Sequence, residues 1–292
     1  MIRRADIRGC DDIVAAGMDD FDHDALYYRI LGAGDGYIFR TDEPAEIAGT
    51  PKIHDRPFYE FDDLRTIGGW LHLGDRVLVL KIPRDAIVEE NRPMSQGGCM
   101  AYSTSTFERV GVITFAELMR TYDAAGMRPG GIHLQRQHFT DFTLPARGVE
   151  RLNLDHCRGS IDLSGVTDRL CLWQCELDVL AWPKALGELD VTHGRLAGPL
   201  APLRSLSLSS VVLADVRLPA GARSVSMFRC TGRIDLSHCR GSLSLTQCEL
   251  EITGIAAEVD QLYASESRFT GISDLPAAAS RIVKDCTFTP AV

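Results

Sequence analysis

The segments Leu152-Asn-Leu-Asp-His-Cys157, Leu170-Cys-Leu-Trp-Gln-Cys175 and Leu243-Ser-Leu-Thr-Gln-Cys248 share one motif, Leu-x-Leu-x-x-Cys. Related motifs recur every 17 to 20 residues from residue 130 onward, and this period is the signature of a solenoid. The first apolar position falls at Ile132, Leu152, Leu170, Leu189, Leu206, Val225, Leu243, Leu262 and Ile282. The second position falls at Leu134, Leu154, Leu172, Val191, Leu208, Met227, Leu245, Ala264 and Lys284.

Alternation of apolar and other residues with period two is typical of a short β-strand that buries one face. Because so short a strand cannot form a stable sheet alone, the repeated strands must stack over a shared core. Residues 129–292 are therefore predicted to form a parallel β-solenoid of about nine turns. The small residue that closes the motif should be buried where the chain leaves the strand, as at Cys157, Cys175, Cys230 and Cys248.

The second half of each unit has apolar residues of its own but is broken by glycine and proline, as at Pro183 and Pro219. It is too short for a helix and is expected to be extended or turn-like. Units such as Leu203-Arg-Ser-Leu-Ser-Leu and Val259-Asp-Gln-Leu-Tyr-Ala resemble short bacterial leucine-rich repeats, although the usual Asn is missing. The resemblance implies a leucine-rich-repeat-like solenoid. Strand-like return segments such as Ser160-Ile-Asp-Leu leave a parallel β-helix as the alternative.

Residues 1–128 lack the repeat and are predicted to form an α+β domain. Arg76-Val-Leu-Val-Leu-Lys-Ile-Pro is a nearly continuous apolar run, which is typical of a central strand. Residues 22–32 have the pattern of a helix with an acidic N-cap and a glycine at its end. A capping box starts a helix over residues 114–126, and this helix is expected to cover the open end of the solenoid.

The composition is that of an ordinary globular chain, with 45% hydrophobic and 24% charged residues. The net charge is −9, and residues 1–128 hold 22 acidic and 15 basic residues against 18 and 16 in residues 129–292. This acidity argues against direct nucleic-acid binding. There is no apolar stretch of transmembrane length and no apolar segment behind the N-terminal basic residues. The recurring cysteines fit reduced thiols, so we expect a cytoplasmic protein without membrane association.

One segment suggests an enzyme. Tyr102-Ser103-Thr104-Ser105 resembles the aromatic-x-Ser-Thr-Ser strand of Arg-Ser-Glu type ADP-ribosyltransferases, and Arg29 could stand for the first-strand arginine of that family. The resemblance implies that Arg29 and Ser103 hold NAD, but no Glu/Gln-x-Glu motif of that family lies between Ser105 and the first repeat, and the predicted helix contains Arg29. An exposed Ser/Thr face of a strand is the alternative. The scattered histidines and cysteines have no metal-ligand spacing, so no metal or cofactor is predicted.

The outward positions of the repeated strands form the largest candidate surface. Its first half is charged, its second half is mainly Ser and Thr, and aromatic residues interrupt both. Exposed aromatic side chains on a rigid sheet are suitable anchors for a protein partner. The predicted binding residues are Trp173, Tyr263, Phe228, Arg151, Asp155, Arg169, Glu188 and Asp190. In the alternative interpretation, Ser and Thr merely solvate the open face.

The sequence therefore favours a non-enzymatic protein–protein interaction module, and a bacterial or phage effector or inhibitor fits its form. The aromatic-rich segment, Trp70 and the apolar strand after it are similar in order to small domains that phage-encoded proteins carry ahead of repeat arrays. One alternative is an ADP-ribosyltransferase-like N-terminal domain whose target the repeats select. The other is an acidic mimic that occupies a nucleic-acid-binding site.

Overall fold

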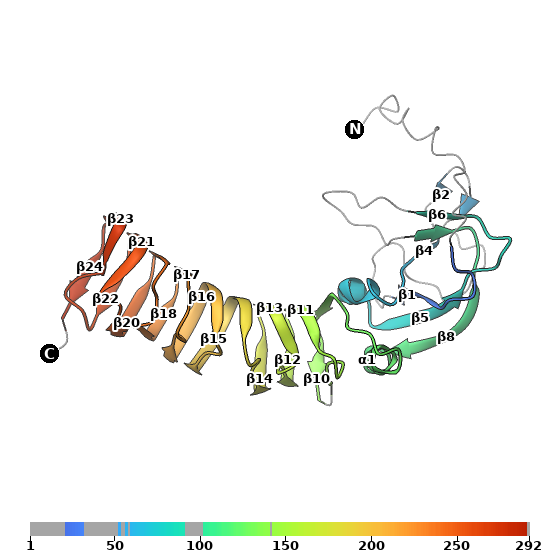
Figure 1. The fold of residues 1–292 in the computed structure, drawn as a ribbon, viewed down its shortest axis with the longest axis horizontal. Coiled ribbons are helices and arrows are strands. Elements are labelled where there is room, and N and C mark those ends of the chain that lie inside the picture. Colours follow the sequence, from blue (N-terminus) through green and yellow to red (C-terminus); the bar gives the residue numbers. More distant parts are fainter. Residues whose placement is uncertain are drawn as a thin grey trace, which may run out of the picture. The chain divides into compact units, whose positions relative to one another are not determined.

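The computed structural model describes residues 21–31, 52–53, 56–57, 59–90, 102–140 and 142–290. The chain packs as two compact units, one comprising Met1–Ile67 and Gly74–Thr114 and the other comprising Gly68–Leu73 and Phe115–Val292. The predicted parallel β-solenoid, preceded by a smaller N-terminal region, is confirmed (Figure 1).

The first unit is built on an antiparallel sheet of β1 (Tyr27–Leu31), β5 (Arg76–Lys81) and β8 (Glu108–Thr114). The strand β5 is central, as its apolar run predicted, and its four middle residues are buried. The other strands of this unit are β2 (Lys52–Ile53), β3 (Arg56–Pro57), β4 (Tyr59–Phe61), β6 (Val88–Glu90) and β7 (Tyr102–Thr104). The core contains Phe61, Leu78, Leu80, Ile82 and Phe107.

The helix predicted for residues 22–32 is wrong. Five of these residues form β1, which pairs with β5 along its whole length. All five side chains of β1 are buried, so the strand shows no alternation that its sequence could reveal. Asp22, which had suggested a helix cap, instead forms a turn in which its side chain accepts a hydrogen bond from the N–H of Asp24 at 3.0 Å.

Two short helices belong largely or wholly to the second unit: the 3-10 helix η1 (Ile67–Leu73) and α1 (Phe115–Ala124). The helix predicted over residues 114–126 is confirmed as α1, with ends that differ by one or two residues. Both helices lie close to β9 (Gly131–Gln135), the first strand of the solenoid. A Cβ atom at Gly68 would lie 3.1 Å from the Tyr122 hydroxyl of α1 and 3.4 Å from the Ile132 side chain of β9.

The first sheet of the solenoid takes one strand from each turn (Figure 1). Its strands are parallel and in register. Leu152, for example, pairs with Ile132 on one side and with Leu170 on the other. After β9 the described chain adds β11 (Val149–Asp155), β13 (Val166–Trp173), β15 (Leu186–Pro199), β16 (Leu203–Arg217), β17 (Ser224–Phe228), β19 (Ser242–Thr246), β21 (Glu258–Ser265) and β23 (Ala277–Lys284).

The return segments are more regular than predicted, because they form strands that also pair in parallel. The long strands β15 and β16, of 14 and 15 residues, contribute to both sides of the solenoid. The other return strands are β10 (His138–Phe139), β12 (Arg158–Asp162), β14 (Glu176–Ala181), β18 (Thr231–Leu236), β20 (Glu249–Ile255), β22 (Arg268–Thr270) and β24 (Thr287–Thr289). Each turn thus has a strand on either side of the core.

A residue in the left-handed conformation forms the corner between the two strands of each turn. These corner residues are Arg136, His156, Gln174, His193, Ser210, Arg229, Gln247, Glu266 and Asp285, with φ between 49° and 55°. For a residue other than glycine this conformation costs about 1 kcal/mol. A backbone hydrogen bond offsets the cost: His156 donates its N–H to the Trp173 carbonyl in the next turn at 2.8 Å.

At every corner except the first, where Gln137 follows Arg136, the next residue is the small residue of the sequence motif. Cys157, Cys230 and Cys248 are buried there as predicted, whereas Cys175 is partly exposed. The thiol of Cys248 lies 3.3 Å from the Thr246 carbonyl oxygen and 3.5 Å from the Met227 carbonyl oxygen. These side chains therefore satisfy carbonyl groups where the chain leaves the first sheet.

The predicted register of the last turn is wrong by one residue. Ile282 was assigned to the core, but it pairs with the outward residue Tyr263 and is 47% exposed. The inward positions are taken by Arg281 and Val283, which pair with Leu262 and Ala264. Most of β23 is exposed, so burial does not impose an apolar pattern on this strand.

Candidate functional site

The outward side chains of the first sheet form one surface, which we call the outer face. Because the strands are in register, these side chains align in columns that run from turn to turn. The column nearest the corner contains Asp155, Trp173, Thr192, Ser209, Phe228, Thr246 and Ser265. The middle column contains Asn153, Cys171, Asp190, Ser207, Ser226, Ser244, Tyr263 and Ile282.

The three aromatic residues predicted as anchors are all exposed on the outer face. Trp173 is 53% exposed, Tyr263 is 42% exposed and Phe228 is 38% exposed. Ile282 adds a fourth large apolar side chain beside Tyr263. It was not predicted as a surface residue, because the predicted register of the last turn placed it in the core. The guanidinium of Arg229 lies 4.7 Å from the centroid of the Phe228 ring, which holds a positive charge at the edge of the apolar residues.

The charged half of the outer face is organised around Arg169. Its Nε lies 3.4 Å from a carboxylate oxygen of Glu188 and 3.3 Å from the Cys171 sulfur. Asp190 lies in the adjoining column, and burial raises the pKa of its carboxyl group. Arg151 pairs with Arg169 in register and is exposed. This half of the face therefore presents both signs of charge.

Asp155, another predicted binding residue, is only 8% exposed, and both of its carboxylate oxygens are engaged. One oxygen accepts a hydrogen bond from Gln135 Nε2 at 2.6 Å. The other lies 2.5 Å from His156 Nδ1. Asp155 thus positions the imidazole of His156, whose ring centroid lies 6.4 Å from that of Trp173.

A histidine pair that the repeat pattern did not reveal lies at the first turn of the solenoid. The rings of His72, from η1, and His133, from β9, stack with their centroids 4.0 Å apart. Burial, together with the neighbouring His72, lowers the pKa of His133 to about 4, although Asp155 opposes this shift. Burial also lowers the pKa of His72. Both imidazoles are therefore neutral near pH 7. No sequence spacing indicates this pair, because His72 lies outside the repeats.

The middle of the outer face is a neutral array of hydroxyl groups. Of the nine outward positions on β16, β17 and β19, eight are Ser or Thr and the ninth is Phe228. The outer face consequently changes from charged to uncharged along the solenoid. This change was visible in the sequence, since it follows directly from the repeat register.

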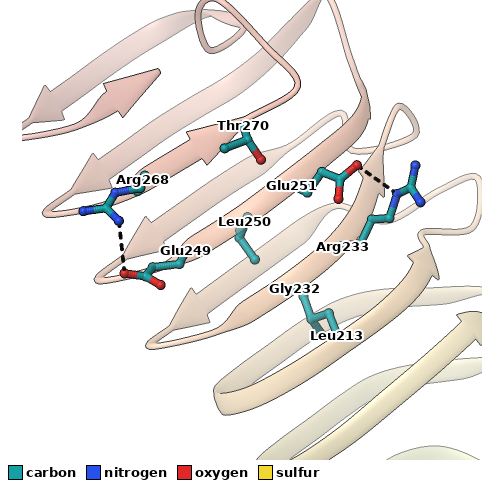
Figure 2. Close-up of a pocket in the computed structure, with 8 residues that line it drawn as sticks. All are labelled: Leu213, Gly232, Arg233, Glu249, Leu250, Glu251, Arg268 and Thr270. Carbon is teal, nitrogen blue, oxygen red and sulfur yellow. Dashed lines mark ion pairs between the residues drawn. The ribbon is translucent and has the colours of Figure 1, made fainter. Parts of the chain in front are cut away.

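A hollow lies on the return strands β18, β20 and β22, between two ion pairs (Figure 2). Its lining residues are Leu213, Gly232, Arg233, Glu249, Leu250, Glu251, Arg268 and Thr270. Arg233 lies 3.2 Å from Glu251, and Arg268 lies 3.9 Å from Glu249. Because each charge in the hollow has a partner of opposite sign, the lining does not favour a charged ligand.

The two enzyme candidates of the first unit lie on different sheets. Arg29 is on β1, a strand where a helix was predicted, and it is fully buried. The backbone of Ser103, on β7, pairs with Glu60 of β4 and Glu89 of β6.

No protein-family model matches this chain, and neither a curated protein nor a solved structure matches it. Across the described residues, no group of three or more His, Cys, Asp or Glu side chains could hold a metal ion. Nor does the described part of the chain contain a helix that is long and apolar enough to span a membrane.

Proposed function

We propose that this chain is a non-enzymatic interaction module that binds a protein partner on the outer face. The observation that supports this proposal best is the exposure of Trp173, Phe228, Tyr263 and Ile282 on one sheet surface. Aromatic side chains provide a large contact area at a low cost in side-chain entropy, and they are enriched among the residues that dominate binding energies. A surface held by registered backbone hydrogen bonds is ordered before the partner arrives, which reduces the entropic cost of association.

The dimensions of the outer face suit a protein partner. Trp173 and Tyr263 are five strands apart, which corresponds to about 24 Å at about 4.8 Å per strand. A partner that contacts both would cover an interface of ordinary size, about 800 Å² on each side. The mixed charges around Arg169 would then orient this partner rather than attract an acid or a base in general.

An effector or inhibitor of bacterial or phage origin, acting in the cytoplasm, is the form of this function that we favour. A solenoid presents a long rigid surface, and a protein that occludes its target needs such a surface. The acidic net charge of −9 makes a nucleic acid an unsuitable partner, because phosphate groups would be repelled.

The test compares two double variants in affinity capture from the native host, followed by titration against the captured partner. Trp173→Ala with Tyr263→Ala should weaken binding at least about tenfold, or about 1.4 kcal/mol. The matched control is Leu180→Ala with Val212→Ala, which removes apolar side chains that are 67% and 51% exposed elsewhere on the solenoid. The control should bind like the unmodified protein. Equal binding by all three proteins would exclude the outer face as the binding surface.

A second candidate is an ADP-ribosyltransferase-like activity in the first unit. The specific observation in its favour is that Arg29 lies on a strand, which removes one objection from the sequence. The absence of a Glu/Gln-x-Glu motif between Ser105 and the repeats and the full burial of Arg29 weigh against it. Arg29→Ala with Ser103→Ala should leave partner binding unchanged. If this variant instead abolished transfer of label from NAD to a host protein, the enzyme would replace our first proposal.

A further inference from the structure

Two pairs of cysteines occupy the position after the corner on consecutive turns. Cys157 and Cys175 form the first pair, and Cys230 and Cys248 form the second. In both pairs the backbone N–H that follows the second cysteine donates to the carbonyl oxygen of the first, at 2.9 Å. The thiols of Cys175 and Cys248 also have equivalent partners, since each lies within 3.5 Å of two carbonyl oxygens, one two residues earlier in the chain and one in the preceding turn. The pairs therefore share one local geometry.

The second cysteines of the two pairs differ in what covers them. Cys248 is 1% exposed, because the next turn places Ser267 over it, and Ser267 Oγ accepts a hydrogen bond from the Cys248 N–H at 3.0 Å. The equivalent position after Cys175 is Gly194, which has no side chain. Cys175 is consequently partly exposed. The first cysteine of each pair is fully buried.

We propose that Cys157 and Cys175 are a redox-active dithiol, which a small-molecule disulfide converts to an intramolecular disulfide while Cys230 and Cys248 stay reduced. The proposal is independent of the protein-binding function. It attributes the difference in reactivity between the two pairs to one residue, Gly194, which leaves Cys175 partly exposed.

The reaction proceeds by two thiol–disulfide exchanges. The Cys175 thiol passes its proton to the Cys157 thiolate as its exposed sulfur attacks the small disulfide, so that a mixed disulfide forms and one small thiolate leaves. The Cys157 sulfur then attacks the Cys175 sulfur, and the second small thiolate leaves. The two protein thiols lose two electrons and two protons, and the small disulfide becomes two small thiols. Cys175 must be the nucleophile of the first exchange, because Cys157 is fully buried.

The acidity of the thiols does not distinguish the pairs. The neighbouring Cys175 thiol lowers the pKa of Cys157 to about 7, and the Cys248 thiol lowers that of Cys230 to about 7. The pKa values of Cys175 and Cys248 are raised by their partner thiols and by burial, so in both pairs the second cysteine keeps its proton. Each pair therefore loses a first proton near neutral pH. Exposure of a sulfur to the small disulfide decides which of the two pairs reacts. Adjacent strands lie about 4.8 Å apart, which falls within the range of Cα separations, about 4.4–6.8 Å, that a disulfide spans.

Oxidised glutathione is a suitable probe, used on the full native chain. After blocking of free thiols, a non-reducing tryptic map should show the peptide Leu152–Arg158 joined to Leu170–Lys184. The cysteines of Cys230–Arg233 and Gly241–Arg268 should carry the blocking group. Cross-linking of both pairs at similar rates, or a glutathione adduct with no cross-link, would refute the proposal.

A reciprocal exchange of the covering residues tests the cause. Gly194→Ser should bury Cys175 and slow its oxidation by at least about tenfold, because access controls exchange at a thiol. The nearest atom to a Cβ at Gly194 is 3.8 Å away, so the side chain fits. Ser267→Gly should uncover Cys248 and make the second pair reactive. If Gly194→Ser left the rate unchanged, access at this position would not be the determinant, whatever the folding of the second variant.

A trapping variant tests the order of the two exchanges. Cys157→Ala removes the second nucleophile, so the glutathione adduct should accumulate on Cys175 and no cross-link should form. Cys171 is the internal control, because it is also partly exposed but lies on the outer face, with its sulfur beside Arg169 instead of a second thiol. An adduct that appeared on Cys171 and not on Cys175 would overturn the assignment.

Discussion

At the scale of single residues, Gly232 shows how closely two turns approach each other. Its φ is +109°, and a Cβ atom there would overlap the carbonyl oxygen of Leu213 in the preceding turn. Gly221 provides a comparison, because its φ is +98° but no atom lies within 4 Å of the position of its Cβ. The first glycine is required both by its conformation and by the close approach, whereas the second is required by its conformation alone.

We expect Gly221→Ala to lower the free energy of unfolding by about 1 kcal/mol, which is the typical cost of an unfavourable backbone conformation. Gly232→Ala should cost more, about 3 kcal/mol, because the clash with the Leu213 carbonyl is added. Chemical denaturation of the two variants measures the difference. Equal destabilisation would mean that the turns can move apart at Gly232 without loss.

The stacked histidines predict a dependence of stability on pH. In the unfolded chain the imidazole of His133 titrates near pH 6.5, whereas burial and His72 lower its pKa to about 4 in the folded protein. Between these values the unfolded chain binds more protons, so this contribution is intact above about pH 6.5 and is lost as the pH falls toward 4. The full shift would correspond to roughly 3 kcal/mol, and partial exposure reduces this to on the order of 1 kcal/mol.

The measurement is the free energy of unfolding from pH 7.5 to pH 4.5, compared with that of His133→Gln. The variant should lose less stability on acidification, because glutamine does not titrate. The groups whose charges act on His133 are His72 and Asp155. Parallel pH profiles for the two proteins would show that His133 is solvated in the folded state.

At the scale of elements, adjacent side chains of β16 point alternately into the core and onto the outer face. Leu208 is 1% exposed, and its neighbour Ser207 points outward. Leu208→Asp places an unpaired charge in the core and should unfold β16 and the turns beside it, because such a burial costs several kcal/mol. Ser207→Asp, the matched control, should melt within a few degrees of the unmodified protein. If Leu208→Asp also melted normally, the register assigned to β16 would be wrong.

The elements also show which parts of the fold the sequence could predict. The repeat gave the solenoid because each inward residue, such as Leu152 or Leu208, is buried by neighbours on both sides, and the apolar period follows. The same physics explains the failures. β1 is buried throughout, so its sequence has no apolar period. β23 is mostly exposed, and Ile282 was predicted to point inward where Val283 does so. A period is readable only where one face is buried and the other is not.

For the candidate site, the exposure of Trp173 and Tyr263 followed from the register, but the histidine pair did not. His72 reaches His133 from a helix outside the repeats, so the contact depends on how η1 packs and leaves no trace in spacing. The difference between Cys175 and Cys248 lies between these cases. Both align in the motif, and only the residue one turn later distinguishes them.

At the scale of the whole solenoid, stability should be graded along its length. Each turn contacts only its neighbours, so its stability depends on local packing and not on one common core. Leu152 and Leu206 are 0% and 1% exposed, whereas six of the eight residues of β23 are exposed. We therefore expect amide hydrogen exchange to be slowest in β15, β16 and β17 and fastest in β23.

A pair of core variants tests this gradation. Leu262→Ala in β21 removes a side chain that is 2% exposed, and a change of this kind costs about 2–5 kcal/mol. It should accelerate exchange in β19, β21 and β23 and leave β9 and β11 protected, because the lost contacts lie in neighbouring turns. Leu152→Ala, which makes the same change in β11, should have the opposite distribution. If either variant accelerated exchange equally in every turn, the solenoid would unfold as one cooperative unit. The reactivity of Cys175 would then depend on its exposure in the folded solenoid and not on unfolding of single turns.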